Sequence, residues 1–170
     1  MGLRAWNVGV LLSALGLLMA SGTQREKSVL AAEHTGAVRG LESNVAAHPL
    51  DAASLRLLSQ QYLDLRAPGM ALRAIEDADP RARTEPTVQH VYARALLDQG
   101  RAAEALAVER RVLAACAEAT CESWLIASAT RRADILRELV DLGVEDAQAH
   151  PESTAIAYYK ATREAHLAVR

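Results

Sequence analysis

Two cysteines are the residues of this sequence with the most distinctive chemistry. Cys116 and Cys121 stand five positions apart, a spacing that could serve a metal site, a redox pair or a disulfide. No Cys-x-x-Cys motif and no nearby histidine accompanies them, so a metal or redox site lacks its usual companions. Cys116 closes one predicted helix and Cys121 opens the next, and a turn between two helices brings such residues within bonding distance. We therefore predict a structural disulfide, which suits an oxidising compartment.

Other residues that could do chemistry do not assemble into a known motif. The five histidines are scattered, with no His-x-x-x-His pair among them: His34, His48, His90, His150 and His166. The sequence contains no Gly-x-Gly-x-x-Gly, no phosphate-binding loop and no Gly-x-Ser-x-Gly. No nucleophile is found beside a base. We therefore predict no metal, no cofactor and no enzymatic activity, with a cofactor-dependent enzyme as a third alternative behind the two given below.

The composition indicates the elements that must position these residues. Phe is absent, aromatic residues make up 4% of the chain, and the apolar residues are mostly Ala, Leu and Val. Ala and Leu lose little side-chain entropy in a helix, whereas strands favour β-branched and aromatic residues. The formal net charge of −2 is too balanced for a protein that binds nucleic acid by neutralising phosphates. We predict an all-α protein without a nucleic-acid partner.

A period of 34 residues organises the middle of the chain. Shifting the sequence by 34 places the residues of segment 52–85 on those of segment 86–119, and small or apolar residues mostly coincide. The first set is Leu55, Leu58, Ser59, Tyr62, Ala71, Ile75 and Ala78, and it falls on Gln89, Tyr92, Ala93, Leu96, Ala105, Glu109 and Val112. Such a period is typical of helical hairpins that stack on one another.

The two segments resemble the tetratricopeptide repeat. Its signature is Trp-x-x-Leu-Gly-x-x-Tyr, followed by Ala-x-x-x-Phe and then Pro. In the first segment Leu58, Tyr62 and Ala71 match the Leu, Tyr and Ala of that signature. The chain departs from it at Arg83, where Pro is expected, and at Glu109, where Phe is expected.

The resemblance implies a short α–α superhelix of stacked antiparallel hairpins. Residues 23–119 would supply a half-repeat and two full repeats. Residues 120–170 would form a long helix and a C-terminal helix with a polar outer face, which closes the stack. Asp51 is placed to cap the first helix of the first full repeat.

The resemblance also implies a binding surface. In tetratricopeptide proteins the first helix of each hairpin lines a concave groove that binds other proteins or peptide segments. Carried over by register, the groove residues of this chain are Arg56, Gln60, Leu63, Asp64, His90, Arg94, Leu97 and Asp98. The alternative is a solvated face, on which charge pairs four residues apart contribute a few tenths of a kcal/mol each.

The first 22 residues have the order of a secretory signal peptide. Arg4 precedes a largely apolar stretch over residues 5–20, small residues follow at Ser21 and Gly22, and charge begins at Arg25. This order predicts export to the periplasm or cell envelope, with cleavage near Gly22. The alternative is an uncleaved helix over residues 5–22 that anchors the chain in a membrane.

These observations lead to two functional hypotheses. The first is an exported, non-catalytic adaptor or scaffold that binds proteins in a cell-envelope assembly. The alternative is a structural subunit anchored in the membrane by its N-terminal helix.

Overall fold

The computed structural model describes residues 35–168 of the 170-residue chain, with side chains to residue 163. The segments for which a signal peptide or anchor is predicted, residues 1–22 and 5–22, lie outside the described residues. The chain divides into two compact units, residues 1–40 and 41–170. In the first unit residues 35–40 are helical.

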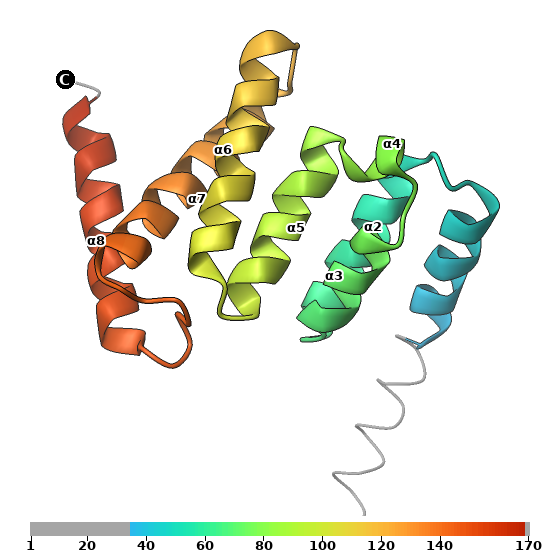
Figure 1. Cartoon of the computed structure of the whole chain (residues 1–170), viewed down its shortest axis with the longest axis horizontal. Coiled ribbons are helices and arrows are strands. Elements are labelled where there is room, and N and C mark those ends of the chain that lie inside the picture. The colour runs from blue at the N-terminus through green and yellow to red at the C-terminus, as the bar shows by residue number, and fades with distance from the viewer. Residues whose placement is uncertain (1–34, 169–170) are drawn as a thin grey trace, which may run out of the picture. The chain divides into compact units, whose positions relative to one another are not determined.

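The second unit is all-α, as predicted, with no strand among its described residues. Residues 41–47 are helical, and the later helices follow in the order seen in Figure 1. They are α2 (Ala52–Asp64), α3 (Pro68–Glu76), α4 (Pro80–Arg83), α5 (Pro86–Asp98), α6 (Ala102–Glu118), α7 (Ser123–Asp141) and α8 (Pro151–Ala168). None of the helices in the described part is long and apolar enough to cross a membrane.

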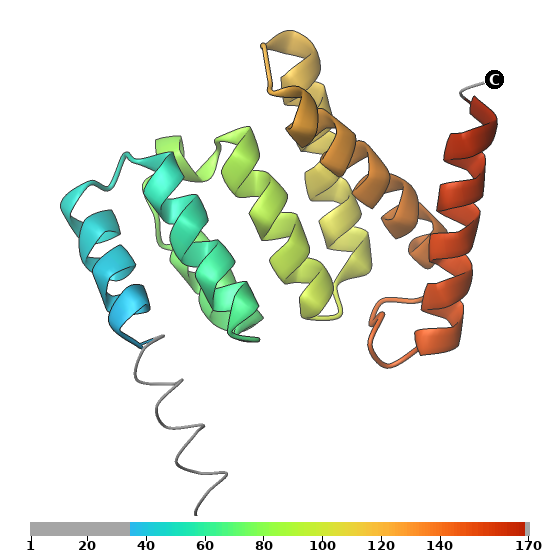
Figure 2. The same ribbon diagram turned by 180° about the vertical axis from the view of Figure 1, so that it is seen from behind.

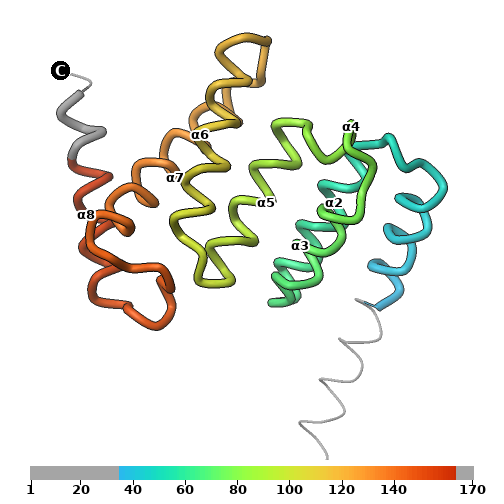
Figure 3. Tube along the Cα trace, viewed as in Figure 1, coloured from blue at the N-terminus to red at the C-terminus, as the bar shows by residue number. Residues whose placement is uncertain are grey.

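The helices pack mainly on their neighbours in the chain. Helices α2 and α3, α5 and α6, and α7 and α8 form contacting pairs, and the members of each pair run in opposite directions (Figures 1 and 2). Helix α5 also packs on both α2 and α3, and α7 packs on α6. The Cα trace in Figure 3 shows that short connections join α2 to α3 and α5 to α6, as antiparallel pairing requires.

Local signals set where the paired helices begin and end. The Asp51 carboxylate accepts hydrogen bonds from the Ala53 backbone N–H at 3.0 Å and from the Ser54 hydroxyl at 2.5 Å, so Asp51 caps α2 as predicted. Between α5 and α6, Gly100 has a φ of 72°. A Cβ at that position would lie 3.1 Å from the Cβ of Asp146, so this turn needs glycine for both its conformation and its space.

The core is built from the positions that repeat every 34 residues. Tyr62, matched to the repeat's tyrosine, is only 7% exposed, and its hydroxyl donates a hydrogen bond of 2.5 Å to Glu42 Oε1. The other buried members of the two series are Leu55, Leu58, Ser59, Ala71 and Ile75, then Ala93, Leu96, Ala105, Glu109 and Val112. The register predicted from the sequence is therefore the register of the core, although Ala78, Gln89 and Tyr92 are only half-buried.

The predicted disulfide is present. Cys116 and Cys121 are bonded, with their Cα atoms 5.2 Å apart. The bond joins the last turns of α6 to the residues just before α7, and both cysteines pack against Val112, Leu125 and Ala129. Because the closed loop is short, the chain-entropy contribution to stability is only about 2 kcal/mol.

The segment around Arg83, where the tetratricopeptide signature has Pro, contains the short helix α4. It forms because the Asp79 carboxylate accepts from the Arg81 N–H at 2.8 Å and Pro80 starts the turn. Helix α8 differs from the sequence-based expectation, because it has no uniformly polar outer face. Its exposed residues include Ile156 and Tyr159.

Candidate protein-binding surface

The eight predicted groove residues lie on two helices that pack against each other. Four are on α2 and four on α5, so the register places them on adjacent elements, as expected. Asp64 is exposed, and the remaining surface residues are half-buried. We call this set the α2–α5 surface: Arg56, Gln60, Asp64, Arg94, Leu97 and Asp98.

Two predicted residues are not part of that surface. Leu63 is 2% exposed and belongs to the core, so it is not available to a partner. His90 is 6% exposed and is held by polar side chains inside the protein. Register alone places a residue on one side of a helix, but the neighbouring helix decides whether that side is covered.

Arg94 links the two helices of the α2–α5 surface. Its guanidinium lies 3.9 Å from Asp64 on α2 and 4.0 Å from Asp98 on its own helix. Gln60 donates a hydrogen bond of 2.9 Å to the same oxygen of Asp64 that faces Arg94. Both ion pairs are too long for direct hydrogen bonds and are solvent-accessible, so they contribute little to stability. Arg56 has no ion pair or side-chain hydrogen bond within the described residues.

A buried polar cluster joins α5, α6 and α7. We call it the His90 cluster, and it contains His90, Glu109, Ser128 and Arg132. His90 Nδ1 lies 2.9 and 3.0 Å from the two carboxylate oxygens of Glu109, and His90 Nε2 lies 2.9 Å from the Ser128 hydroxyl. Arg132 donates hydrogen bonds of 2.7 Å to Glu109 and 2.6 Å to the His90 carbonyl oxygen.

The charge balance of the His90 cluster follows from burial. Glu109 is 0% exposed, and an isolated carboxylate there would be very costly. Burial lowers the pKa of Arg132, while the nearby Glu109 carboxylate acts in the opposite direction. The guanidinium stays charged, and it therefore neutralises Glu109 directly. The carboxylate also accepts from His90, so we place the histidine proton on Nδ1.

The order of hydrogen bonds from Ser128 through His90 to Glu109 is that of a hydrolase triad. Sequence reasoning had not found it, because no motif joins the three residues. However, Ser128 lies well inside α7, where the neighbouring backbone N–H groups bond within the helix. They are therefore not available as an oxyanion hole beside that hydroxyl. The geometry accounts for packing between three helices better than for acyl transfer.

One signal in the sequence pointed to the His90 cluster. Glu109 occupies the position where the tetratricopeptide signature has Phe, so an acid stands where the register demands a core residue. A buried acid needs a cation or several donors. The identity of those donors was not readable, because His90 lies 19 positions before Glu109 and Arg132 lies 23 positions after it.

No group of three or more potential metal ligands is found in the described part of the chain. Comparison of the chain with protein families, with curated proteins and with solved structures finds no match to any of them. The class that sequence and fold together define is an all-α protein with a disulfide. What it does must be argued from its surfaces.

Proposed function

We propose that this chain is an exported, non-catalytic adaptor of the tetratricopeptide-like kind, which binds a peptide segment of another protein on the α2–α5 surface. The observation that carries the proposal is that Arg56 and Arg94 on this surface have hydrogen-bond donors to spare. The carboxylates nearest to Arg94 lie beyond hydrogen-bond distance, so its guanidinium has donors to offer. Arg56 has no side-chain partner in the described residues.

The chemistry of the partner follows from these donors. Guanidinium groups bind carboxylates and backbone carbonyl oxygens. Gln60 offers an amide, and half-buried Leu97 offers apolar contact beside the charged groups. An extended or helical segment with carboxylates and accessible carbonyls would satisfy them.

Export is the second part of the proposal. The Cys116–Cys121 bond supports it, because disulfides persist mainly in oxidising compartments. The order of residues 1–22 supports it independently. The alternative is a structural subunit held in a membrane by residues 5–22. In that case the mature chain would keep residues 1–22, whereas an exported chain would lose them by cleavage near Gly22.

The binding proposal is tested by reversing both surface charges. We expect the double variant Arg56→Glu/Arg94→Glu to lose a captured partner from native envelope extracts at least tenfold, because both donors become acceptors. Its free energy of unfolding should change by no more than about 0.5 kcal/mol per substitution. Quantitative mass spectrometry of captured proteins and urea denaturation measure the two effects.

A matched control comes from α6. Arg110 and Arg111 are exposed on that helix, so Arg110→Glu/Arg111→Glu changes the net charge by the same amount away from the α2–α5 surface. The control should keep every partner that the wild type captures. Equal capture by wild type and by the α2–α5 variant would refute the proposed surface.

The absence of catalysis is part of the proposal and has its own test. We expect Ser128 to remain unmodified by a fluorophosphonate probe, since its hydroxyl has no backbone oxyanion site beside it. Intact-protein mass spectrometry after incubation measures the modification, and Ser128→Ala is the control. Labelling of the wild type that disappears in Ser128→Ala would identify an activated serine and replace the adaptor proposal with a hydrolase.

A further inference from the structure

A small pocket lies among α4, α5 and α6, and every charged side chain that lines it is positive. Its volume is about 260 Å³, below the roughly 300–1,000 Å³ of pockets that hold drug-sized molecules. Arg83 lines it from α4 and Arg111 from α6, and no carboxylate is found among the described residues around it. We call it the Arg83–Arg111 pocket, and its size suits a compact ligand.

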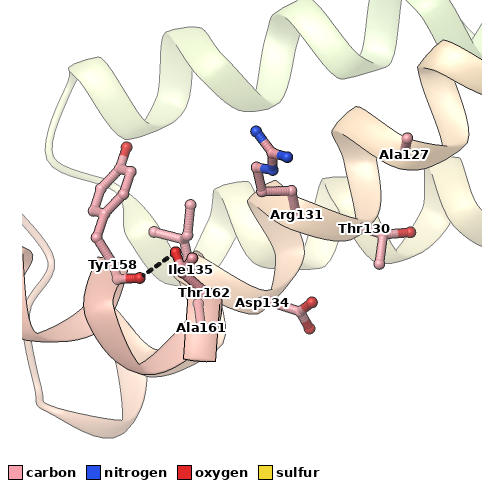
Figure 4. Close-up of a pocket in the computed structure, with 8 residues that line it drawn as sticks. All are labelled: Ala127, Thr130, Arg131, Asp134, Ile135, Tyr158, Ala161 and Thr162. Carbon is pink, nitrogen blue, oxygen red and sulfur yellow. Dashed lines mark hydrogen bonds between the residues drawn. The ribbon is translucent and has the colours of Figure 1, made fainter. Parts of the chain in front are cut away.

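A larger cleft of the same protein provides a contrast. It has a volume of about 540 Å³, lies between α7 and α8, and contains Asp134 as well as Arg131 (Figure 4). Asp134 is in turn paired with Arg137 at 3.2 Å. The larger cleft therefore has charges of both signs, whereas the Arg83–Arg111 pocket has only guanidinium groups. Of the two, only the smaller pocket is electrostatically complementary to an anion.

Both guanidinium groups of the pocket have donors to offer. Neither arginine has an ion pair within the described residues. Arg83 donates a hydrogen bond of 2.9 Å to the Glu76 carbonyl oxygen, which holds its guanidinium and leaves the other N–H groups available. Arg111 is exposed and makes no side-chain hydrogen bond in that part of the chain. Two cations that line one small pocket repel each other, and an anion bound between them removes the repulsion.

Two departures from the repeat pattern meet at this pocket. Arg83 stands where the tetratricopeptide signature has Pro, and Gln89 falls on the buried Leu55 of the first segment. Gln89 lines the same pocket, and its side-chain amide donates a hydrogen bond of 2.8 Å to the Arg83 carbonyl oxygen. Polar residues therefore replace apolar ones at two positions of the repeat, and one of them holds the backbone of the other.

We propose that the Arg83–Arg111 pocket is a binding site for a phosphate dianion, either as part of a small phosphate monoester or as free phosphate. A phosphate monoester has a charge of about −1.5 to −2 at pH 7 and three acceptor oxygens, so it balances two guanidinium groups. A carboxylate has one charge and leaves one guanidinium unbalanced. The planar fork of N–H groups on arginine matches phosphate oxygens in pairs. No residue of the α2–α5 surface lines the pocket, so this site is separate from the one proposed for a protein partner.

Isothermal titration calorimetry of the full chain with glycerol 3-phosphate tests the proposal. The wild type should bind it at one site. Arg83→Gln and Arg111→Gln should each weaken binding at least about tenfold, because each removes charge-assisted hydrogen bonds. Arg111 makes no hydrogen bond or ion pair within the described residues, so Arg111→Gln should keep the stability of the wild type in urea denaturation. Arg110→Gln is the matched control, since Arg110 is exposed on the same helix but does not line the pocket.

The pH dependence identifies the charge state that is bound. Lowering the pH from about 7.5 to about 5 converts most of the ester to its monoanion, whose pKa is about 6, and should weaken binding about tenfold. The charged residues of the pocket are arginines, which stay protonated over this interval. Sulfate keeps both of its charges, so its dissociation constant should not change. Inorganic phosphate distinguishes the two sources: equal affinity supports free phosphate, and tighter binding of the ester supports a phosphorylated small molecule.

Three results would each overturn the proposal. They are no binding by the wild type at millimolar glycerol 3-phosphate, binding by Arg111→Gln equal to that of the wild type, and acetate binding as tightly as the ester. The two proposed sites also fail independently. Arg110→Glu/Arg111→Glu should lose glycerol 3-phosphate binding and keep the protein partner, whereas Arg56→Glu/Arg94→Glu should keep glycerol 3-phosphate binding and lose the partner.

Discussion

Replacing Arg132 by methionine is expected to lower the free energy of unfolding by about 3–5 kcal/mol. Methionine supplies an apolar side chain of similar length, but it leaves the fully buried Glu109 carboxylate without its cation. His90 alone cannot offset the desolvation of that charge. Urea denaturation at neutral pH measures the loss. Arg73→Met is the matched control, since Arg73 and Asp77 form an ion pair that is largely exposed, and it should cost no more than about 1 kcal/mol.

A second substitution shows whether the cost comes from the buried charge. The double variant Glu109→Met/Arg132→Met removes both charges and is expected to recover most of the lost stability, because a buried ion pair can be exchanged for apolar residues at little cost. His90 then loses its acceptor, which leaves a residual cost of about 1–3 kcal/mol. If the double variant is no more stable than Arg132→Met alone, then Arg132 stabilises the protein through contacts other than Glu109.

Replacing Tyr62 by alanine is expected to cost a similar amount, about 3–5 kcal/mol, as do other truncations of aromatic core residues. The side chain is 7% exposed, so alanine leaves a cavity in the core formed by the repeat. Tyr62→Phe is the control. It keeps the ring, loses only the hydrogen bond to Glu42, and should cost about 1 kcal/mol. A thermal midpoint unchanged by Tyr62→Ala would show that the first repeat does not depend on this residue.

The stability that Tyr62 contributes also depends on pH. Burial, reinforced by the hydrogen bond to Glu42, raises the pKa of Tyr62 from 10.0 to about 12. The folded state therefore holds the phenol proton more tightly than the unfolded chain. Its contribution to stability is complete below pH 10.0 and is lost as the pH rises towards 12. We expect Tyr62→Phe to lose less stability than wild type over that interval.

The helices themselves were largely predictable. The 34-residue shift and the cap at Asp51 located α2, α3, α5 and α6, because helix formation depends on spacings of three and four residues and on the first and last turns. The repeat positions also identified most of the core, since Tyr62 and Ile75 lie where that register requires burial. The disulfide was predictable for a similar reason, because Cys116 and Cys121 are close in the chain.

The binding surface was predictable only in part. Register placed Arg56, Gln60 and Arg94 on adjacent helices, and the structure brings Arg94 near Asp64 of the neighbouring helix. Register also included Leu63 and His90, which packing buries. Helical spacing tells which residues share a face, but the boundary between a covered and an open face depends on the angle and distance to the next helix.

The sequence by itself determined the local elements and the short-range disulfide, because each of these depends on residues within one or two turns of each other. It also contained the 34-residue period at which the elements recur, because that period is a comparison of the sequence with itself. Only the tertiary structure decided that Glu109 would meet His90 and Arg132, and that α8 would leave apolar residues exposed beside a cleft. Those contacts join helices whose residues are 19 to 42 positions apart, and packing rather than spacing brings them together. An acid at position 109, in a core register, indicated that a buried partner was needed. Only the packing of α5, α6 and α7 identified His90 and Arg132 as its partners.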